Sequence, residues 1–153
     1  MRIKRLFEFA AITLMVSASV QAAQVQISDA MARAMPPSVP NTAGYAKLTA
    51  DTDDRLLAAQ CDGVERTEIH TILMEDGLMK MRPVAAVELP QGREVLLEQG
   101  GYHLMMMGLN RAAKVGGSYD CQLTFAKAPP QLVRFVVRAI QQPQAETHQH
   151  HHH

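Results

Sequence analysis

The chain contains no tryptophan, and aromatic residues make up only 5% of its 153 residues. A core with so few rings must be filled by aliphatic side chains and by some of the ten methionines. Basic and acidic residues are equal in number, at 15 each, so the chain lacks the positive excess that marks nucleic-acid-binding proteins. It also lacks a glycine-rich phosphate loop and an evident pair of nucleophile and base. We therefore expect neither a nucleic-acid-binding protein nor an enzyme.

Apolar runs long enough to cross a membrane are also missing. Three basic residues among the first five precede the apolar stretch 9–16, which leads into the small residues of "SASVQA". This order is typical of a secretory signal peptide and not of a membrane anchor. We expect residues 1–22 to be a signal peptide, and the mature protein to be soluble and periplasmic. Cleavage after Ala22 removes three basic residues and Glu8, which leaves 12 basic against 14 acidic residues.

Cysteine is scarce, with only Cys61 and Cys121 in the chain. In a protein exported to an oxidising compartment, these two residues are first interpreted as a candidate disulfide. Closing a loop of this length would stabilise the fold by about 4 kcal/mol on the chain-entropy model. A pair of thiolate metal ligands is the alternative. Alternation along "YDCQLTF" turns Cys121 towards the core, which favours the structural role.

Seven short apolar runs between residues 43 and 140 are separated by glycine, proline and aspartate. The runs are "AGYAKLTA", "RTEIHTILM", "LMKMRPV", "EVLLEQ", "YHLMMMGL", "YDCQLTFA" and "LVRFVVRAI". Short runs with frequent turn signals predict an all-β sandwich or barrel. Alternation is clearest at residues 119–125 and 133–139, where every second side chain is apolar and is expected to face the core. We expect one β-sandwich domain over residues 23–140, present as a monomer.

Little of the chain is predicted to be helical. Only "DTDDRLLAA" fits a helical turn, in which Asp51 or Thr52 would cap a short segment through Leu57. The proline-rich stretch 32–44 is predicted to form a loop before the first core strand. After Ile140 the chain becomes polar, so we expect a disordered tail at residues 141–153.

The segment "MEDGLM" contains an Asp76-Gly77 pair between two strand-like runs, which is the strongest short signal for a two-residue hairpin turn. A turn centred on this pair fixes the register of the two strands. It pairs Glu75 with Leu78, Met74 with Met79, Ile72 with Met81, and His70 with Pro83. His70 and Met81 then become diagonal neighbours on one face, with backbones about 7 to 8 Å apart. Their side chains could lean together and share a metal ion.

The segment "YHLMMMGL" offers a second histidine beside methionines. Strand alternation places His103, Met105 and Met107 on one face, with Leu104 and Met106 on the other. One imidazole and one thioether from each segment would give a four-ligand set of two histidines and two methionines. Thioethers are soft, uncharged ligands that suit Cu(I). Methionine also fills irregular cores, so the spacing alone leaves a packing role open.

The spacing of these residues resembles the motif of the periplasmic PCu(A)C copper chaperones. His70 is followed after ten residues by Met81, then after 21 residues by His103 and, two positions on, by Met105. Two segments are similar to the motif segments of the family: "EIHTILMEDGLMKMRPV" and "GGYHLMMMGL". The N-terminal segment of the family resembles "DAMARAMPP" followed by "AGYAKLTA". Departures occur at Thr71, where many members have methionine, at Gln99, in place of a common proline, and at Met31, in place of an aromatic residue.

The resemblance implies a cupredoxin-like, Greek-key β-sandwich that binds Cu(I) through His70, Met81, His103 and Met105. Members of the family carry copper in the periplasm and help to load the copper centres of cytochrome c oxidases, often alongside Sco-type proteins. We therefore expect a copper chaperone that delivers its ion by ligand exchange. Its expected partner is a copper-accepting oxidase subunit, a Sco-type copper protein or both.

Two other classes of protein remain as alternatives. An electron-transfer cupredoxin needs two histidines and a cysteine as ligands, and no histidine follows Cys121 before the tail. A metal-free interaction module would use the methionine face as a contact surface. That interpretation treats both pairs of histidine and methionine as coincidence.

The tail ends in "HQHHHH" and is interpreted as a secondary metal site for Cu(II), with an expression tag as the alternative. The chain keeps its signal peptide and Gln149 interrupts the run, and both features favour a native tail. The candidate ligands are His148, His150, His151, His152 and His153.

Overall fold

The computed structural model describes residues 22–140, so the predicted tail and, apart from Ala22, the predicted signal peptide lie outside the described residues. Within this range all regular structure is strand, and no helix there is long and apolar enough to cross a membrane. The predicted all-β class is confirmed. The strands are β1 (Val25–Arg33), β2 (Asn41–Ala50), β3 (Asp54–Cys61), β4 (Val64–Glu75), β5 (Leu78–Pro83), β6 (Val87–Leu89), β7 (Glu94–Leu97), β8 (His103–Leu109), β9 (Ser118–Phe125) and β10 (Gln131–Arg138).

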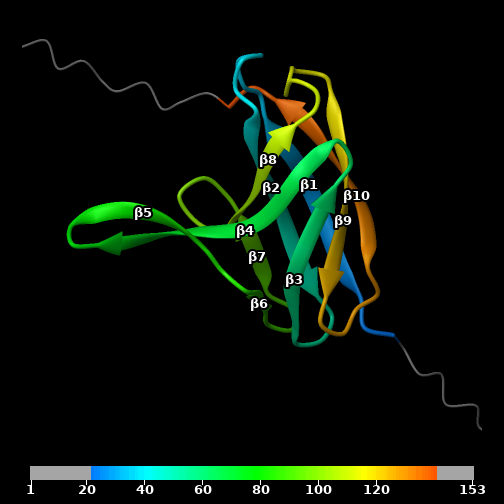
Figure 1. Cartoon of the computed structure of the whole chain (residues 1–153). Coiled ribbons are helices and arrows are strands. Elements are labelled where there is room, and N and C mark those ends of the chain that lie inside the picture. The colour runs from blue at the N-terminus through cyan, green and yellow to red at the C-terminus, as the bar shows by residue number, and fades with distance from the viewer. Residues whose placement is uncertain (1–21, 141–153) are drawn as a thin grey trace, which may run out of the picture.

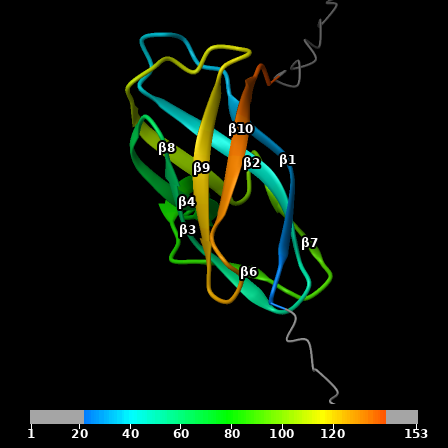
Figure 2. The same ribbon diagram turned by 90° about the vertical axis from the view of Figure 1, so that its right-hand side faces the viewer.

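The strands belong to one continuous sheet that folds over into two layers (Figure 1). The strand order is β5-β4-β8-β2-β1-β10-β9-β3-β6, and β7 pairs with the second half of β2. The pairing of β1 with β10 is parallel, and the other pairings among these strands are antiparallel. Figure 2 looks onto β9 and β10, with β8 and β4 behind them. Buried side chains from both layers, such as Met106 of β8 and Phe135 of β10, form the core between them.

The predicted alternation of the last two runs holds over most of their length. On β9 the apolar face predicted at residues 119–125 is buried at every second position. On β10, Phe135 and Val137 are buried and Val133 packs against the core. Ala139 lies beyond the end of β10 and is exposed, so the prediction is wrong for this residue. The reason is that strand pairing with β9 ends at Val136, before Ala139 is reached.

The helical turn predicted at Asp51 to Leu57 is wrong, because β3 starts at Asp54. The carboxylate of Asp54 is buried and accepts hydrogen bonds from the backbone N–H groups of Arg55, Lys127 and Ala128, at 2.7, 2.9 and 2.8 Å. Asp54 therefore ties the start of β3 to the loop that follows β9. These long-range hydrogen bonds override the local capping signal.

The loop predicted at residues 32–44 is shorter than expected and does not precede the first core strand. β1 extends through Arg33 and β2 begins at Asn41, which leaves residues 34–40 between the two strands. Ala32 is fully buried in β1. The three prolines of this stretch all fall within residues 34–40, so β1 continues up to the proline-rich segment without losing a backbone donor.

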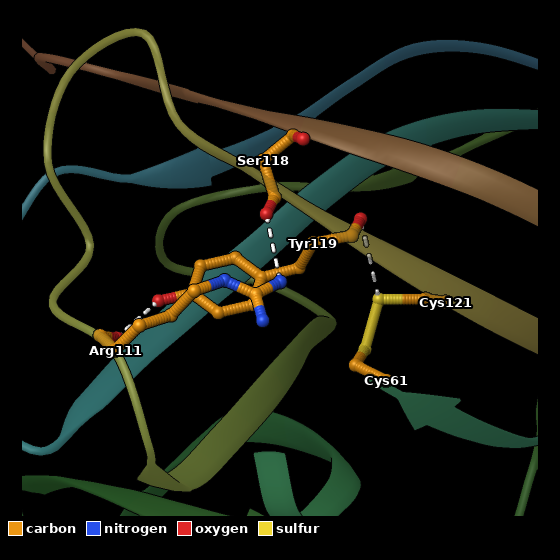
Figure 3. The surroundings of a disulfide bond; sticks show 5 residues. All are labelled: Cys61, Arg111, Ser118, Tyr119 and Cys121. Atoms are coloured by element: carbon orange, nitrogen blue, oxygen red, sulfur yellow. Dashed lines mark hydrogen bonds between the residues drawn. A yellow bond between two sulfur atoms is a disulfide. The ribbon is translucent and has the colours of Figure 1, made fainter. Parts of the chain in front are cut away.

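A disulfide joins β3 to β9 inside the fold (Figure 3). Cys61 and Cys121 are opposite each other in the ladder, and their sulfur atoms are 2.03 Å apart. Beside them, the hydroxyl of Tyr119 donates a hydrogen bond to the carbonyl of Arg111 at 2.8 Å, and burial raises the pKa of Tyr119. The guanidinium of Arg111 lies 4.6 Å from the centre of the Tyr119 ring and donates to the carbonyl of Ser118. Neither cysteine sulfur is a free thiol in this structure.

Replacing Asp54 with alanine is expected to lower the free energy of unfolding by about 2 to 3 kcal/mol, because backbone donors in the interior lose their acceptor. Burial by itself would raise the pKa of Asp54, but the hydrogen bonds from Ala128, Arg55 and Lys127 outweigh it and lower the pKa. The stabilisation is therefore fully present above the unfolded value of about 3.9 and is lost as the pH falls through the lower folded value. Urea unfolding at pH 7 and at pH 3 measures both effects.

The matched control is Asp53→Ala, which removes an exposed carboxylate that accepts a single hydrogen bond, from the N–H of Gln91. This variant should lose less than about 1 kcal/mol. Equal losses in the two variants would contradict the role assigned to Asp54.

Candidate metal centre

The hairpin of β4 and β5 has the register that its turn predicts. Asp76 and Gly77 have φ values of 53° and 75°, as a type I′ turn requires at both central positions. The paired residues are Glu75 with Leu78, Met74 with Met79, Ile72 with Met81, and His70 with Pro83. The predicted hairpin and its register are confirmed. Met81 thus lies one diagonal step from His70.

The other edge of β4 pairs with β8, and this pairing brings the two histidines together. His70 and His103 are direct partners across the ladder, with ring centroids 6.0 Å apart and an interplanar angle of 63°. Glu68, two residues before His70 on β4, is opposite Met105, two residues after His103 on β8. The sequence did not predict this pairing, because no local signal joins two strands that lie far apart in the chain.

Met81, His103 and Met105 line one pocket of about 420 Å³ on the outer face of the sheet. Segments 34–40 and 98–102 supply part of its wall, through Val39 and Gly100 among others. The other lining residues are Arg33, Met35, Asn41, Thr42, Ala43, Tyr45, Ile72 and Gln99. His70 is not a lining residue, and it joins the group through its contact with His103. All four predicted ligands therefore come from one face of β5, β4 and β8.

The ring of His103 is oriented by the backbone. Its Nδ1 lies 3.0 Å from the carbonyl oxygen of Gly101, which can only accept a hydrogen bond. Nδ1 must therefore carry the proton, and Nε2 keeps its lone pair in the neutral ring. That Nε2 atom is buried and has no hydrogen-bond partner among the described residues. A buried polar atom without a partner is costly unless something binds it.

The ring of His70 is oriented by a carboxylate in the same way. Its Nε2 lies 2.8 Å from Oε2 of Glu68, whose other oxygen is 3.1 Å from Nε of Arg66. The hydrogen bond with His70 lowers the pKa of Glu68, and the charge of Arg66 adds to this effect. An ionised carboxylate accepts only, so Nε2 donates and Nδ1 keeps the lone pair in the neutral ring. This Nδ1 atom is also buried without a partner in the described part of the chain.

The four side chains differ in their exposure, and Met105 is half-buried. His103 is 3% exposed and the His70 side chain 13%, whereas Met81 is 48% exposed. On β8 the predicted faces are confirmed, because Leu104 and Met106 are fully buried in the core and point away from the pocket. The group therefore combines two buried nitrogen lone pairs with a thioether that reaches solvent.

This donor set limits which ions the site could hold. Two imidazoles and two thioethers carry no charge and are soft or borderline ligands. Within residues 22–140 there is no cluster of three or more histidine, cysteine, aspartate or glutamate side chains that could hold a metal ion. Because Cys121 is in the disulfide, it offers no thiolate for a blue-copper site. The electron-transfer alternative, already disfavoured by the sequence because no histidine follows Cys121 before the tail, has no support in this structure.

Two features that orient the histidines were missed from the sequence. Glu68 stands two residues before His70, so strand alternation places both on one face, and this signal was available. The contact of His103 with the carbonyl of Gly101 depends on how segment 98–102 folds, and no pattern in the sequence indicates it.

Comparison with known proteins agrees with the fold and the motif. Residues 25–137 match the family described as "Putative lipoprotein LpqE-like". No functionally curated protein matches the chain. The apo PCuAC domain from PmoF1 has a TM-score of 0.66 and 22% identity, covering 78% of this chain and 98% of that one. The copper-bound PCuAC domain from PmoF2 has a TM-score of 0.64 and 20% identity, covering 78% and 97%.

A third solved structure is more similar in sequence. The solution structure of CuI-DR1885 from Deinococcus radiodurans has a TM-score of 0.58 and 30% identity, covering 79% of this chain and 83% of that one. The PmoF domains, which are less than 25% identical, show the shared cupredoxin-like β fold. The match over residues 25–137 and the identity with DR1885 show more than the fold: the chain belongs to the LpqE-like family of PCu(A)C proteins.

Proposed function

We propose that the protein is a copper chaperone that binds Cu(I) through His70, Met81, His103 and Met105. The observation that carries this proposal is the pair of buried imidazole nitrogens, Nδ1 of His70 and Nε2 of His103, that lack hydrogen-bond partners beside two thioethers. Solved relatives support it, because one PCuAC domain of PmoF2 and one form of DR1885 are described as copper-bound. Copper is the cargo of such a protein and not a resident cofactor.

The environment of the donors suits a singly charged, soft ion. Neutral ligands leave Cu(I) with its positive charge, and an unpaired charge is costly to bury. The ionised carboxylate of Glu68 is hydrogen-bonded to His70. It therefore supplies a negative charge on the far side of the His70 ring from the proposed ion. A ligating histidine commonly donates its second ring N–H to such an outer partner, which fixes the ring and raises its basicity.

Release requires that one ligand can be exchanged without unfolding the site. Met81 is the most exposed of the four, and it lies on β5 of the hairpin, one diagonal step from His70. An incoming ligand from an acceptor would therefore reach the ion first on the side of Met81. This sequence of ligand exchange makes and breaks only metal–ligand bonds, so the proposal requires no enzymatic step.

The proposed place of action is the periplasm, on the evidence of the signal peptide predicted at residues 1–22. A family described as lipoproteins is compatible with export. The acceptor proposed for the ion is a copper-binding oxidase subunit, reached directly or through a Sco-type protein. This part of the proposal rests on the family resemblance.

The tail is proposed to capture Cu(II) in addition. Its five histidines are clustered imidazoles, which suit borderline divalent ions. The stretch 141–153, fully extended, spans at most about 45 Å, enough to reach across a domain of this size. A tethered site of this kind raises the local concentration of copper near the pocket.

Removing a ligand is expected to weaken Cu(I) binding. In tail-deleted protein, His103→Ala should weaken the affinity by about 100-fold or more, because it removes a buried donor. Met81→Leu and Met105→Leu should weaken it by about tenfold each, since a single thioether is a weaker ligand. Competition with a chromophoric Cu(I) chelator measures each dissociation constant.

The matched control is Met107→Leu. Met107 lies on the same strand and face as Met105, but it does not line the pocket. Its Cu(I) affinity should equal that of the parent. Unchanged affinity in both His103→Ala and Met81→Leu would refute the proposed site.

Glu68→Ala is expected to weaken Cu(I) binding by about 10-fold to 100-fold, the usual effect of losing an outer partner of a metal-ligating histidine. Glu68→Gln should recover part of the affinity, because the amide oxygen still accepts the hydrogen bond but carries no charge. The same chelator competition distinguishes the variants. If Glu68→Ala binds like the parent, Glu68 does not position His70 for the metal.

Deleting residues 147–153 should lower the number of Cu(II) ions bound per chain and leave the Cu(I) affinity of the pocket unchanged. Equilibrium dialysis with metal analysis gives the Cu(II) stoichiometry, and the chelator competition gives the Cu(I) affinity. Equal Cu(II) stoichiometry with and without these residues would rule out a metal-binding tail.

A further inference from the structure

The outer half of the β4–β5 hairpin extends away from the rest of the fold (Figure 1). β4 pairs with β8 as far as His70 and with β5 from His70 to Glu75, so beyond His70 its only strand partner among the described residues is β5. We call residues 71–82 the arm. The arm begins at the candidate metal centre, because His70 and Met81 stand at its base.

The two faces of the arm differ in composition. On one face Glu75 forms ion pairs with Arg82 at 2.7 Å and with Lys80 at 3.4 Å. The opposite face is uncharged and carries three methionines that are exposed to solvent. These are Met74 at 68%, Met79 at 67% and Met81 at 48% exposure. Since exposed apolar surface of this kind is unfavourable in water, the face calls for a functional explanation.

The exposed methionines and the exposed leucines of the arm lie on opposite faces. The two exposed aliphatic positions on the charged face are Leu73 and Leu78, at 46% and 63% exposure. The face that continues from the metal centre carries methionine at Met74, Met79 and Met81 instead. What distinguishes this face is therefore the thioether sulfur, which is soft and polarizable and can bind an ion such as Cu(I).

The register places the sulfur-bearing side chains within reach of a common ion. Met74 and Met79 are direct partners across the ladder. The Cβ atoms of such partners lie about 4.5 to 5.5 Å apart, and each methionine has three rotatable bonds with which to converge. Met81 is the diagonal neighbour of Met74, about 7 to 8 Å away. The three thioethers therefore form a continuous row that leads from the arm to the pocket.

We propose that Met74 and Met79 form a second, weaker Cu(I) site on the arm, from which the ion passes to Met81 and into the candidate metal centre. The passage to the centre rests on the function proposed above, whereas the arm site does not. Two thioethers in water bind Cu(I) weakly, and because the site is exposed the charge of the ion stays solvated. A weak exposed site can exchange its ion quickly with solution or with an acceptor.

The transfer is a ligand exchange with no change of oxidation state. A bond from copper to the sulfur of Met81 forms as the bond to the sulfur of Met74 breaks, and copper remains Cu(I) throughout. The bonds to His70, His103 and Met105 then form as the bond to the sulfur of Met79 breaks. No proton or electron is transferred, provided that both imidazoles are neutral when the ion arrives.

Nuclear magnetic resonance of the mature protein, with the methionine methyl groups labelled with ¹³C, tests the arm site directly. Cu(I) is added without oxygen in the presence of a reductant. Below one equivalent the methyl signals of Met81 and Met105 should shift, and beyond one equivalent those of Met74 and Met79 should shift together. In the double variant His70→Ala/His103→Ala, the signals of Met74 and Met79 should shift from the first addition.

The outcomes separate the two proposals. If Met74 and Met79 do not shift in either protein with several equivalents of Cu(I), the arm site is overturned and the pocket is unaffected. If they shift while Met81 and Met105 do not, the arm site stands and the proposed function is wrong.

Paired substitutions test whether the sulfur atoms matter. Met74→Leu/Met79→Leu keeps the apolar surface and removes the thioethers, and it should slow the extraction of Cu(I) by a chromophoric chelator by about tenfold. Leu73→Ala/Leu78→Ala, on the other face of the arm, is the matched control and should leave the rate unchanged. If the leucine variant keeps the parent rate and only Met74→Gln/Met79→Gln slows extraction, the face is an apolar contact surface and the proposal is overturned.

Discussion

The pairing of β4 with β8 is the contact on which the candidate metal centre depends. It places His70 opposite His103, and the hairpin turn at Asp76-Gly77 then adds Met81 from the next strand. A shift of the β4–β8 register by one residue would turn His70 to the other face of the sheet and separate the two rings. The register is held by the core, because Ile69 and Leu104, the neighbours of the two histidines, are paired and buried on the opposite face. The packing that stabilises the sandwich thus also positions the site.

β8 serves the core and the pocket at the same time through strict alternation. Met106 is buried against the facing layer, while Met105 lines the pocket. Close packing on the core side depends on Gly44, where an added Cβ would lie 2.8 Å from Cε of Met106. A side chain at this position would force Met106 to move, and Met106 is flanked by Met105 and Met107. A methionine in the core and a methionine in the site are therefore neighbours in sequence but differ in role.

The features set by local chemistry could be predicted from the sequence, and those set by distant contacts could not. The hairpin register follows from two residues with positive φ, and the faces of β8 and β9 follow from alternation. β1 and β3 were missed because their edges are marked by prolines and aspartates that also signal loops and helix caps. Their strand character comes from pairing with β10 and β9. The proposed ligand set came from the spacing and the family resemblance, while the ring orientations needed the contacts to Glu68 and Gly101.

The proposed donors combine two oriented imidazoles with an exposed thioether at Met81, which suits the proposed role of a carrier. His103 is buried and the side chain of His70 is 13% exposed. Each ring is held by a hydrogen bond through one nitrogen, so the other nitrogen, which is buried, has a fixed direction. Met81 is half exposed and lies at the base of the arm, where it can turn away without disturbing the core. A site with four buried donors would hold the ion too firmly to pass it on, and one with four exposed donors would lose it to solution. Met81 lies between the histidine rings and the exposed methionines of the arm, so in the proposed mechanism its exchange would set the rate of transfer.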